Sequence, residues 1–220
     1  MARVSIPEME ATGHTPETVF SQIMLLAESA TERLSVGHRK NVLTDATGTL
    51  LAMGQKFLKQ AYSLQTLADL EQDAMSCYGL IRMQADNLCV MYRIYANKNE
   101  DETTFRYLLY FLDGNRQRKE TLSCDYQYDG HCTKEEYDSI HKQVGSAIAN
   151  AESVINTCLK LLDNHPYKTL NPTLFQKIVD AGNWKYETFD ATLTKPKRQT
   201  WEDLYAQIDI RQNIQSFYSY

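Results

Sequence analysis

The sequence predicts an all-α protein, a bundle of about six or seven helices built around two long antiparallel helices. Its 220 residues include only nine Gly and five Pro, and so few chain breakers favour long helices over a β fold with many turns. Apolar residues recur at helical spacing in most segments. Alternating strand patterns are nearly absent, and the best of them, NWKYETF at 183–189, is weak.

The chain is expected to begin with a flexible N-terminal arm, because residues 1–14 lack helical periodicity. Residues 15–220 are then expected to form a single helical-bundle domain. Its first helix should begin at Thr15, which can cap it, with Pro16 at the first helical position and an acidic residue facing the positive end of the helix dipole. This helix should end near Gly37.

The next two predicted helices differ in length. A helix over about 46–62 has a clear apolar face, although Gly48 and Gly54 weaken its start. The following segment, about 64–97, contains no Pro and a single Gly. As one helix it would be roughly 50 Å long, and it is the first of the two long helices.

A fourth helix should begin near Glu102, with a kink or an end at the turn signal of residues 113–115. Thr133 and Glu136 have the spacing of a capping box. They start the second long helix, over 133–163, whose wide apolar stripe predicts burial against other helices.

Two shorter helices complete the predicted bundle. The Asn-Pro pair at 171–172 starts one that should end at Gly182. After an irregular stretch over 183–199, a capping box at Thr200 starts the last helix. This helix has no C-terminal cap signal, so we expect either that the natural chain continues past Tyr220 or that the helix is completed by a group outside the given sequence.

Composition argues against several classes of protein. The net charge of −5 at pH 7 disfavours broad, non-specific nucleic-acid binding, which needs a basic surface. No apolar run approaches the roughly 18 residues of a membrane span, and the N-terminus lacks the apolar segment of a signal peptide. Five Cys at irregular spacing argue against a disulfide framework. We therefore expect a cytoplasmic protein with reduced thiols.

A line of polar residues along the predicted 64–97 helix is the main candidate for a site. One narrow face of the helical wheel holds Glu71, Met75, Tyr78, Arg82, Asp86, Cys89 and Arg93. The other faces are apolar, so this helix should be central, and buried charges on it would need partners on other helices. The resulting candidate polar site comprises Arg82, Asp86, Arg93, Tyr78, Arg106, Arg116 and Tyr205.

Two interpretations of this candidate site are open. It is either a salt-bridge network that holds the helices in register or a ligand-binding or catalytic site, because both arrangements perturb charges. No signature of nucleophilic catalysis or of a phosphate-binding loop occurs in the chain. Cys124, His131 and Cys132 lack the closely spaced pair of a zinc site. No metal and no cofactor are therefore expected.

Two segments, YSLQTLADLEQDAMSCYGLIRMQADNLCVMYRIY and RYLLYFLDGNRQR, resemble a group of uncharacterised all-helical prokaryotic proteins that are distantly similar to HEPN domains. Members of that group carry Leu-x-Arg with an acidic residue four positions later, matched here by Leu80, Arg82 and Asp86, with Asp where Glu is usual. Members also end in Tyr-x-x-x-Ser-x-x-x-His, and this chain lacks that Ser and His. The resemblance implies a helical fold and, as an expectation, a HEPN-like activity.

The Arg-x4-His spacing of HEPN ribonucleases also occurs at Arg33 and His38, where we interpret it as chance.

Whether the chain is an enzyme is left open. A clear core pattern without a catalytic signature favours a non-enzymatic binding or interaction module for an unknown protein or small-molecule partner. The alternative is a HEPN-like ribonuclease or toxin/defence-type domain that uses Arg82 and Asp86, and RNA is expected as a partner only in that case. A third hypothesis is a small-molecule pocket lined by Tyr78, Tyr92, Arg93 and Tyr110. No membrane partner is expected, and a homodimer is left open.

Overall fold

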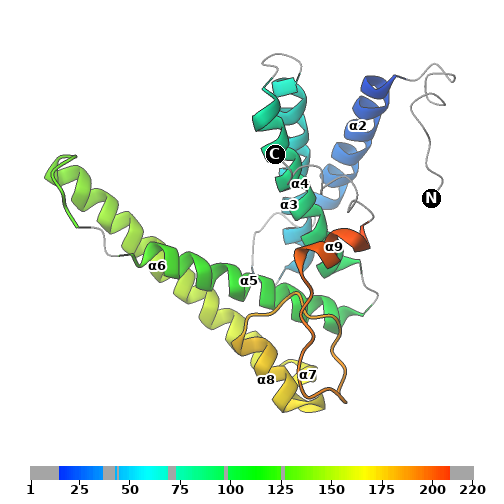
Figure 1. Cartoon of the computed structure of the whole chain (residues 1–220), viewed down its shortest axis with the longest axis vertical. Helices are drawn as coiled ribbons and strands as arrows, with labels where there is room; N and C mark the ends of the chain where they lie inside the picture. Colours follow the sequence, from blue (N-terminus) through cyan, green and yellow to red (C-terminus); the bar gives the residue numbers. More distant parts are fainter. Residues whose placement is uncertain are drawn as a thin grey trace. The chain divides into compact units, whose positions relative to one another are not determined.

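The computed structural model describes residues 15–36, 43, 45–68, 73–96, 99–124 and 127–208. Within these residues the protein contains eight helices and no strand, which confirms the predicted all-α class (Figure 1). The helices are α2 (Pro16–Ser35), α3 (Ala46–Thr66), α4 (Ala74–Tyr95), α5 (Glu100–Leu122), α6 (Lys134–Asp163), α7 (Pro166–Leu170), α8 (Pro172–Asp180) and α9 (Trp201–Gln207). The predicted arm over 1–14 and the last twelve residues lie outside the described part of the chain.

The described residues divide into two compact units within α4. The first unit extends to Met91, and the second begins with Tyr92. The expectation of a single domain over 15–220 stays a prediction. None of the described helices combines the length and the apolar character that crossing a membrane requires.

The helices of the first unit begin at capping residues. Thr15 Oγ1 accepts a hydrogen bond from the backbone N–H of Thr18 at 3.3 Å, which confirms the predicted start of α2. Asp45 caps α3 by accepting from the N–H of Gly48 at 2.8 Å. A Cβ atom on Gly48 would lie 2.6 Å from Asp45 Oδ2. Gly48 therefore makes room for this cap and does not merely weaken the helix.

The prediction of one continuous helix over 64–97 is wrong. Helix α3 ends at Thr66, and α4 begins at Ala74. Asp73 is the local cause, because its Oδ1 accepts a hydrogen bond from the N–H of Ser76 at 3.1 Å and so starts a new helix. The predicted arrangement around two long antiparallel helices, of which this was one, is not confirmed.

Within the first unit, α2 packs against α3, and α3 and α4 run antiparallel. The side-chain amide of Gln84 donates to the carbonyl oxygen of Phe57 at 3.3 Å. Cys77, earlier in α4, lies against Leu64, later in α3. The two helices thus advance in opposite directions, which follows from their short connection.

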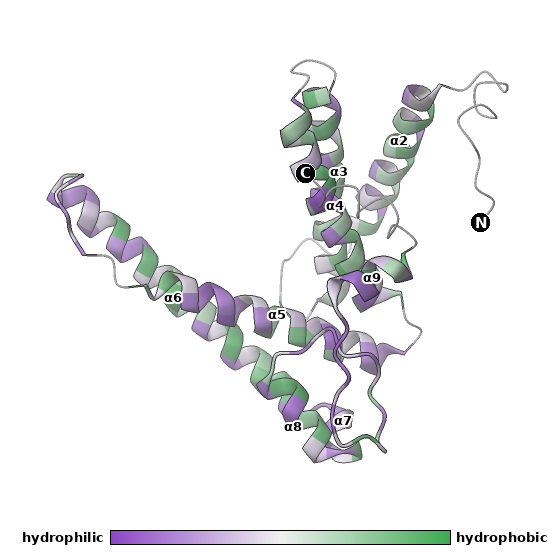
Figure 2. Ribbon diagram, in the orientation of Figure 1, coloured by the Kyte–Doolittle hydropathy of each residue, from purple (hydrophilic) through white to green (hydrophobic). Residues whose placement is uncertain are grey.

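The second unit is organised around an antiparallel hairpin of α5 and α6 (Figure 1). Near one end, Tyr167, just beyond α6, donates its hydroxyl to Glu102 at 2.8 Å. Farther along, Lys119 of α5 forms an ion pair with Glu152 of α6 at 2.8 Å. Helix α6 matches the predicted 133–163 helix, including its capping box at Thr133. Figure 2 shows that hydrophobic and hydrophilic residues alternate along both helices, as expected for amphipathic packing.

Helix α5 continues through residues 113–115, so a helix end there is wrong, and the alternative of a kink stays a prediction. The local turn signal is overridden by packing along α6, because burial of the apolar face outweighs the weak helix propensity of Gly114. Gly182 ends α8 as predicted. It has a φ of 58°, and a Cβ atom there would lie 3.4 Å from Asp113, so the residue suits both the left-handed turn and the close approach.

The core of the second unit lies where the base of the α5–α6 hairpin meets α8 and the segment 183–200. The fully buried side chains of this unit come from six parts of the chain: Ile94, Phe105 with Leu109 and Leu112, Cys158 with Leu162, Leu174 with Ile178, Tyr186, and Leu204. Segment 183–200 is irregular, as predicted. Its weak strand pattern forms only an isolated antiparallel bridge between Tyr186 and Arg198.

Candidate functional site

The residues of the predicted polar site belong to both units. Tyr78, Arg82 and Asp86 lie in the first unit. Arg93, Arg106, Arg116 and Tyr205 lie in the second.

Arg106 is the most enclosed charged residue of the second unit among those described, with 3% of its surface exposed. Its Nη1 donates to the carbonyl oxygens of Trp184 at 3.2 Å and Tyr186 at 2.7 Å, and its Nη2 donates to that of Glu187 at 3.1 Å. Nη2 also pairs with Glu102, one helical turn earlier. The guanidinium thus fastens segment 183–200 to α5.

The ring of Tyr186 completes the surroundings of Arg106. The guanidinium carbon lies 4.0 Å from the centre of this ring, a distance at which the negative face of the ring attracts a cation. Burial raises the pKa of the Tyr186 hydroxyl well above its usual value, and the positive charge of Arg106 opposes this effect. Tyr186 is therefore a neutral packing partner for the cation.

Arg93, at the end of α4, reaches the same carbonyl groups. Its Nη2 donates to the carbonyl oxygens of Tyr186 and of Glu187, the latter at 2.6 Å. Burial, followed by the positive charge of Arg106, lowers the pKa of Arg93 to about 10. Among the described residues Arg93 forms no ion pair with a carboxylate. Two guanidinium groups therefore converge on one short stretch of backbone.

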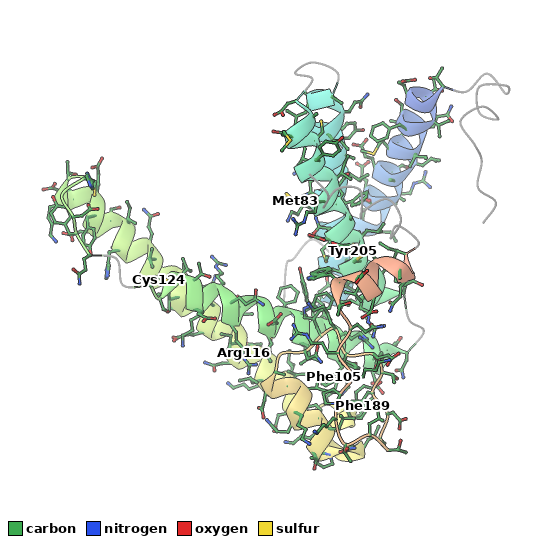
Figure 3. The ribbon with its side chains drawn as sticks, viewed as in Figure 1. Met83, Phe105, Arg116, Cys124, Phe189 and Tyr205 are labelled. Carbon is green, nitrogen blue, oxygen red and sulfur yellow. The ribbon has the colours of Figure 1, made fainter. Side chains whose placement is uncertain are left out.

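A pocket of about 550 Å³ adjoins this cluster in the second unit. We call it the arginine pocket; its lining includes Arg93, Asn99, Glu102, Arg106, Tyr167, Glu187, Thr188 and Phe189. The rings of Tyr167 and Phe189 stack with centres 4.1 Å apart, and Phe189 also meets the ring of Phe105 edge-on. Figure 3 labels Phe105 and Phe189. The pocket thus combines charged groups with an aromatic wall.

Arg116 and Tyr205 do not line the arginine pocket. Arg116 Nη1 donates to the carbonyl oxygens of Val179 and Asp180, both at 3.0 Å. This position at the C-terminal end of α8 lets its charge offset the negative end of the helix dipole. Tyr205 is buried, with its ring centre 6.0 Å from that of Trp201. Of the four candidate residues in the second unit, only Arg93 and Arg106 therefore line this pocket.

In the first unit, Arg82 is exposed, Asp86 is half-buried and Tyr78 is exposed on α4. Cys89, one turn after Asp86, is buried, and its pKa is raised to about 12 by burial and then by the charge of Asp86. Such a thiol stays protonated and is a poor nucleophile. Glu71, which the predicted polar line included, and His38 lie outside the described residues.

Sequence reasoning missed Glu102 as the carboxylate of the site and Tyr186 and Glu187 as its backbone acceptors. One signal was present for Glu102, because Glu followed four residues later by Arg is the favoured order for an ion pair on a helix. Across the described residues, no group of three or more His, Cys, Asp or Glu side chains is placed to hold a metal ion.

His165 caps α7 beside the arginine pocket and is held as a neutral imidazole. Its Nδ1 accepts from the backbone N–H of Tyr167 at 3.2 Å, so Nε2 carries the proton and donates to the carbonyl oxygen of Asp101 at 3.0 Å. Burial lowers its pKa from the ordinary value of 6.5, although the bond to Asp101 opposes this shift. A second proton would have to be placed on Nδ1, against the N–H of Tyr167.

We expect the free energy of unfolding to fall as the pH falls below about 6.5. The unfolded chain protonates His165 at a higher pH than the folded chain, so it binds more protons in this window, and acid favours unfolding. Urea unfolding at pH 7.5 and 5.5 measures the effect. His165→Asn keeps a capping side chain and should reduce this pH dependence, whereas the exposed His141→Asn should leave it unchanged. Equal pH dependence in His165→Asn and the native chain would contradict the prediction.

No protein-family model, curated protein or solved structure matches the chain. The resemblance of Leu80, Arg82 and Asp86 to the HEPN-like group therefore stays a prediction.

Proposed function

We propose that the chain is a non-enzymatic helical-bundle protein that binds a small polar molecule in the arginine pocket. The observation that carries this proposal is a cavity of about 550 Å³ whose charged side chains are all held by neighbouring groups. Glu102 accepts from Arg106 and Tyr167, and Glu187 pairs with Lys197 at 2.9 Å. Side chains fixed in this way favour recognition over proton transfer, which needs a base free to take up a proton.

The nearest imidazole supports the same conclusion. Both ring nitrogens of His165 are engaged with backbone groups, so neither is free to exchange a proton with a substrate. The aromatic wall of Tyr167 and Phe189 supplies the apolar surface that small-molecule pockets usually have.

The test is thermal unfolding in the presence of a library of small polar molecules. We expect at least one compound to raise the Tm in a dose-dependent manner, because a ligand that binds only the folded state stabilises it. Thr188 is exposed and lines the pocket, so Thr188→Trp should fill the pocket and abolish the shift. Thr194 is exposed in the same segment but does not line the pocket, and Thr194→Trp should keep the shift. Equal shifts in the two variants would reject the pocket as the binding site.

A ribonuclease of the HEPN-like kind is the second candidate, favoured by the exposure of Arg82 on α4. It is tested by incubating the protein with single-stranded RNA in the presence of a metal chelator. Cleavage that is lost in Arg82→Ala but kept in the exposed Arg118→Ala would make the non-enzymatic proposal wrong. The leading proposal expects no cleavage by any of the three proteins.

A further inference from the structure

The start of helix α6 extends past the end of α5, its partner in the hairpin. The ion pair between Lys119 and Glu152 sets the antiparallel register. The last residue of α5, Leu122, comes three positions after Lys119 and so lies opposite about residue 149, three positions before Glu152. Residues 134–148 of α6 therefore project beyond α5 by roughly 20 Å, and Figure 1 shows this projection at the tip of the hairpin.

The projecting part of α6 carries an apolar stripe. Tyr137, Ile140, Val144 and Ile148 share one face of the helix. Farther along α6, where α5 lies alongside, the same face is buried, as at Cys158. Beyond the end of α5 that cover is lost, and Ile140 has 56% of its surface exposed.

A pocket of about 600 Å³ lies over this stripe, and we call it the tip pocket. Its volume is within the range of small-molecule sites. Most of its lining is apolar or aromatic: Leu122, Tyr137, Ile140, His141, Val144 and Ile148. The rings of Tyr137 and His141 stack with centres 5.9 Å apart. The tip pocket shares none of these residues with the arginine pocket.

The polar part of the lining holds no acidic residue, lysine or arginine. It consists of Ser123, Cys124 and Gln127, together with the small residue Gly145. An ion that entered this part of the described structure would lose its water without gaining a partner of opposite charge, which is costly. Apolar surface is stabilised by burial at the same place. The composition of the lining therefore selects for an uncharged ligand.

The exposed apolar surface at the tip is too small for a protein partner. Among the large hydrophobic side chains described for α5, α6 and their connection, only Ile140 and Tyr128 are exposed, at 56% and 44%. A stable interface buries about 800 Å² on each partner, of which two such side chains supply only a fraction. A small molecule therefore suits this pocket better than a second copy of the chain.

We infer that the tip pocket binds an uncharged, mainly apolar small molecule. Its ligand covers residues 134–148 of α6 in place of the apolar contacts that α5 makes with the rest of that helix. This site is additional to the arginine pocket, and it takes the opposite class of ligand, since the arginine pocket is proposed to bind a polar molecule.

The experiment uses three probes with the same aromatic body and different charges: neutral naphthalenemethanol, anionic naphthoate and cationic naphthylmethylamine. Binding of each to the native chain is measured by calorimetry at neutral pH. We expect the Kd of naphthalenemethanol to be at least about tenfold lower than that of either ion, because each ion has to bury an unpaired charge.

Thiol alkylation locates the bound probe. Cys124 is exposed and lines the tip pocket, whereas the half-buried Cys132 at the other end of the same loop is not part of the lining. Saturating naphthalenemethanol should slow the reaction of Cys124 with iodoacetamide severalfold, as followed by mass spectrometry of the peptides. The reaction of Cys132 should keep its rate.

Two matched variants test the pocket itself. A Cβ atom at Gly145 would have no neighbouring atom within 4 Å, so Gly145→Leu places a side chain in the open pocket, and leucine is the better helix former. This variant should weaken the Kd of naphthalenemethanol at least about tenfold. Gly114 of α5 has equally open surroundings but does not line the pocket, so Gly114→Leu should bind as the native chain does.

Several outcomes would overturn the inference. They are ions that bind as tightly as the alcohol, equal affinities in the two leucine variants, an unprotected Cys124, or no binding by any of the three probes. A native dimer in sedimentation that Gly145→Leu disrupts would also overturn it, because a second copy would then fill the pocket. Thr188→Trp fills only the arginine pocket and should leave naphthalenemethanol binding unchanged, so the failure of one site is distinguishable from the failure of the other.

Discussion

Arg106→Met is expected to lower the free energy of unfolding of the second unit by about 3–5 kcal/mol. The substitution keeps an apolar side chain of similar length but leaves the carboxylate of Glu102 without its cationic partner. It also removes the donor to the carbonyl oxygen of Trp184 and one of two donors to those of Tyr186 and Glu187. Stranding a buried charge and several acceptors costs more than the net value of the ion pair.

The chain is well suited to this measurement. Its two tryptophans are Trp184 and Trp201, both in the second unit, so tryptophan fluorescence during urea unfolding follows that unit alone.

Arg118→Met, on the exposed surface of α5, is the matched control and should change the stability by less than about 0.5 kcal/mol. The double variant Glu102→Gln/Arg106→Met should be less destabilised than Arg106→Met, because no carboxylate is then stranded. If Arg106→Met lowered the free energy of unfolding by less than about 1 kcal/mol, the hydrogen bonds of the guanidinium would not be the main interaction that holds segment 183–200 against α5.

Phe105→Ala is expected to cost about 3–5 kcal/mol as well, for a different reason. Phe105 is fully buried, and five aromatic rings lie within 5.9 Å of its own: His165, Tyr167, Phe175, Tyr186 and Phe189. Removing its ring opens a cavity at the point where α5, α7, α8 and segment 183–200 meet. Rings held by one another in this way cannot all move to fill the space.

The same fluorescence measurement applies to this prediction. Phe105→Leu retains most of the volume and should be less destabilising than Phe105→Ala. Phe111→Ala, six residues along α5 at a half-buried position with only Tyr107 and Tyr110 as ring neighbours, should also cost less. If Phe111→Ala were as damaging as Phe105→Ala, the aromatic cluster would not be the centre of the core.

Helix starts were the most predictable part of the fold. Thr15, Thr133 and Thr200 each form a capping box with a residue three positions later, so the whole signal lies within four residues. The start of α4 at Asp73 was missed although it depends on the same kind of cap, because the apolar periodicity on both sides of it suggested one helix. The continuation of α5 through residues 113–115 could not be predicted from the neighbouring residues, because it depends on packing against α6.

The candidate site was predictable only in its two arginines. Arg93 and Arg106 were both selected from their positions on helices, whereas Glu102 was missed, although its place four residues before Arg106 is the favoured order for an ion pair. The main acceptors of the two arginines are the backbone carbonyl groups of residues 184–187. Every residue type carries such a group, so no side-chain pattern marks these positions.

The sequence by itself thus determined the all-α class, most helix boundaries and the arginines that carry the candidate site, because caps, periodicity and charge act over short distances along the chain. Only the tertiary structure decided that Arg93 and Arg106, from different helices, meet at one stretch of backbone beside a cavity. That convergence depends on the path of segment 183–200. The path is set by burial of Tyr186 against Phe105 and Arg106 rather than by any local conformational preference.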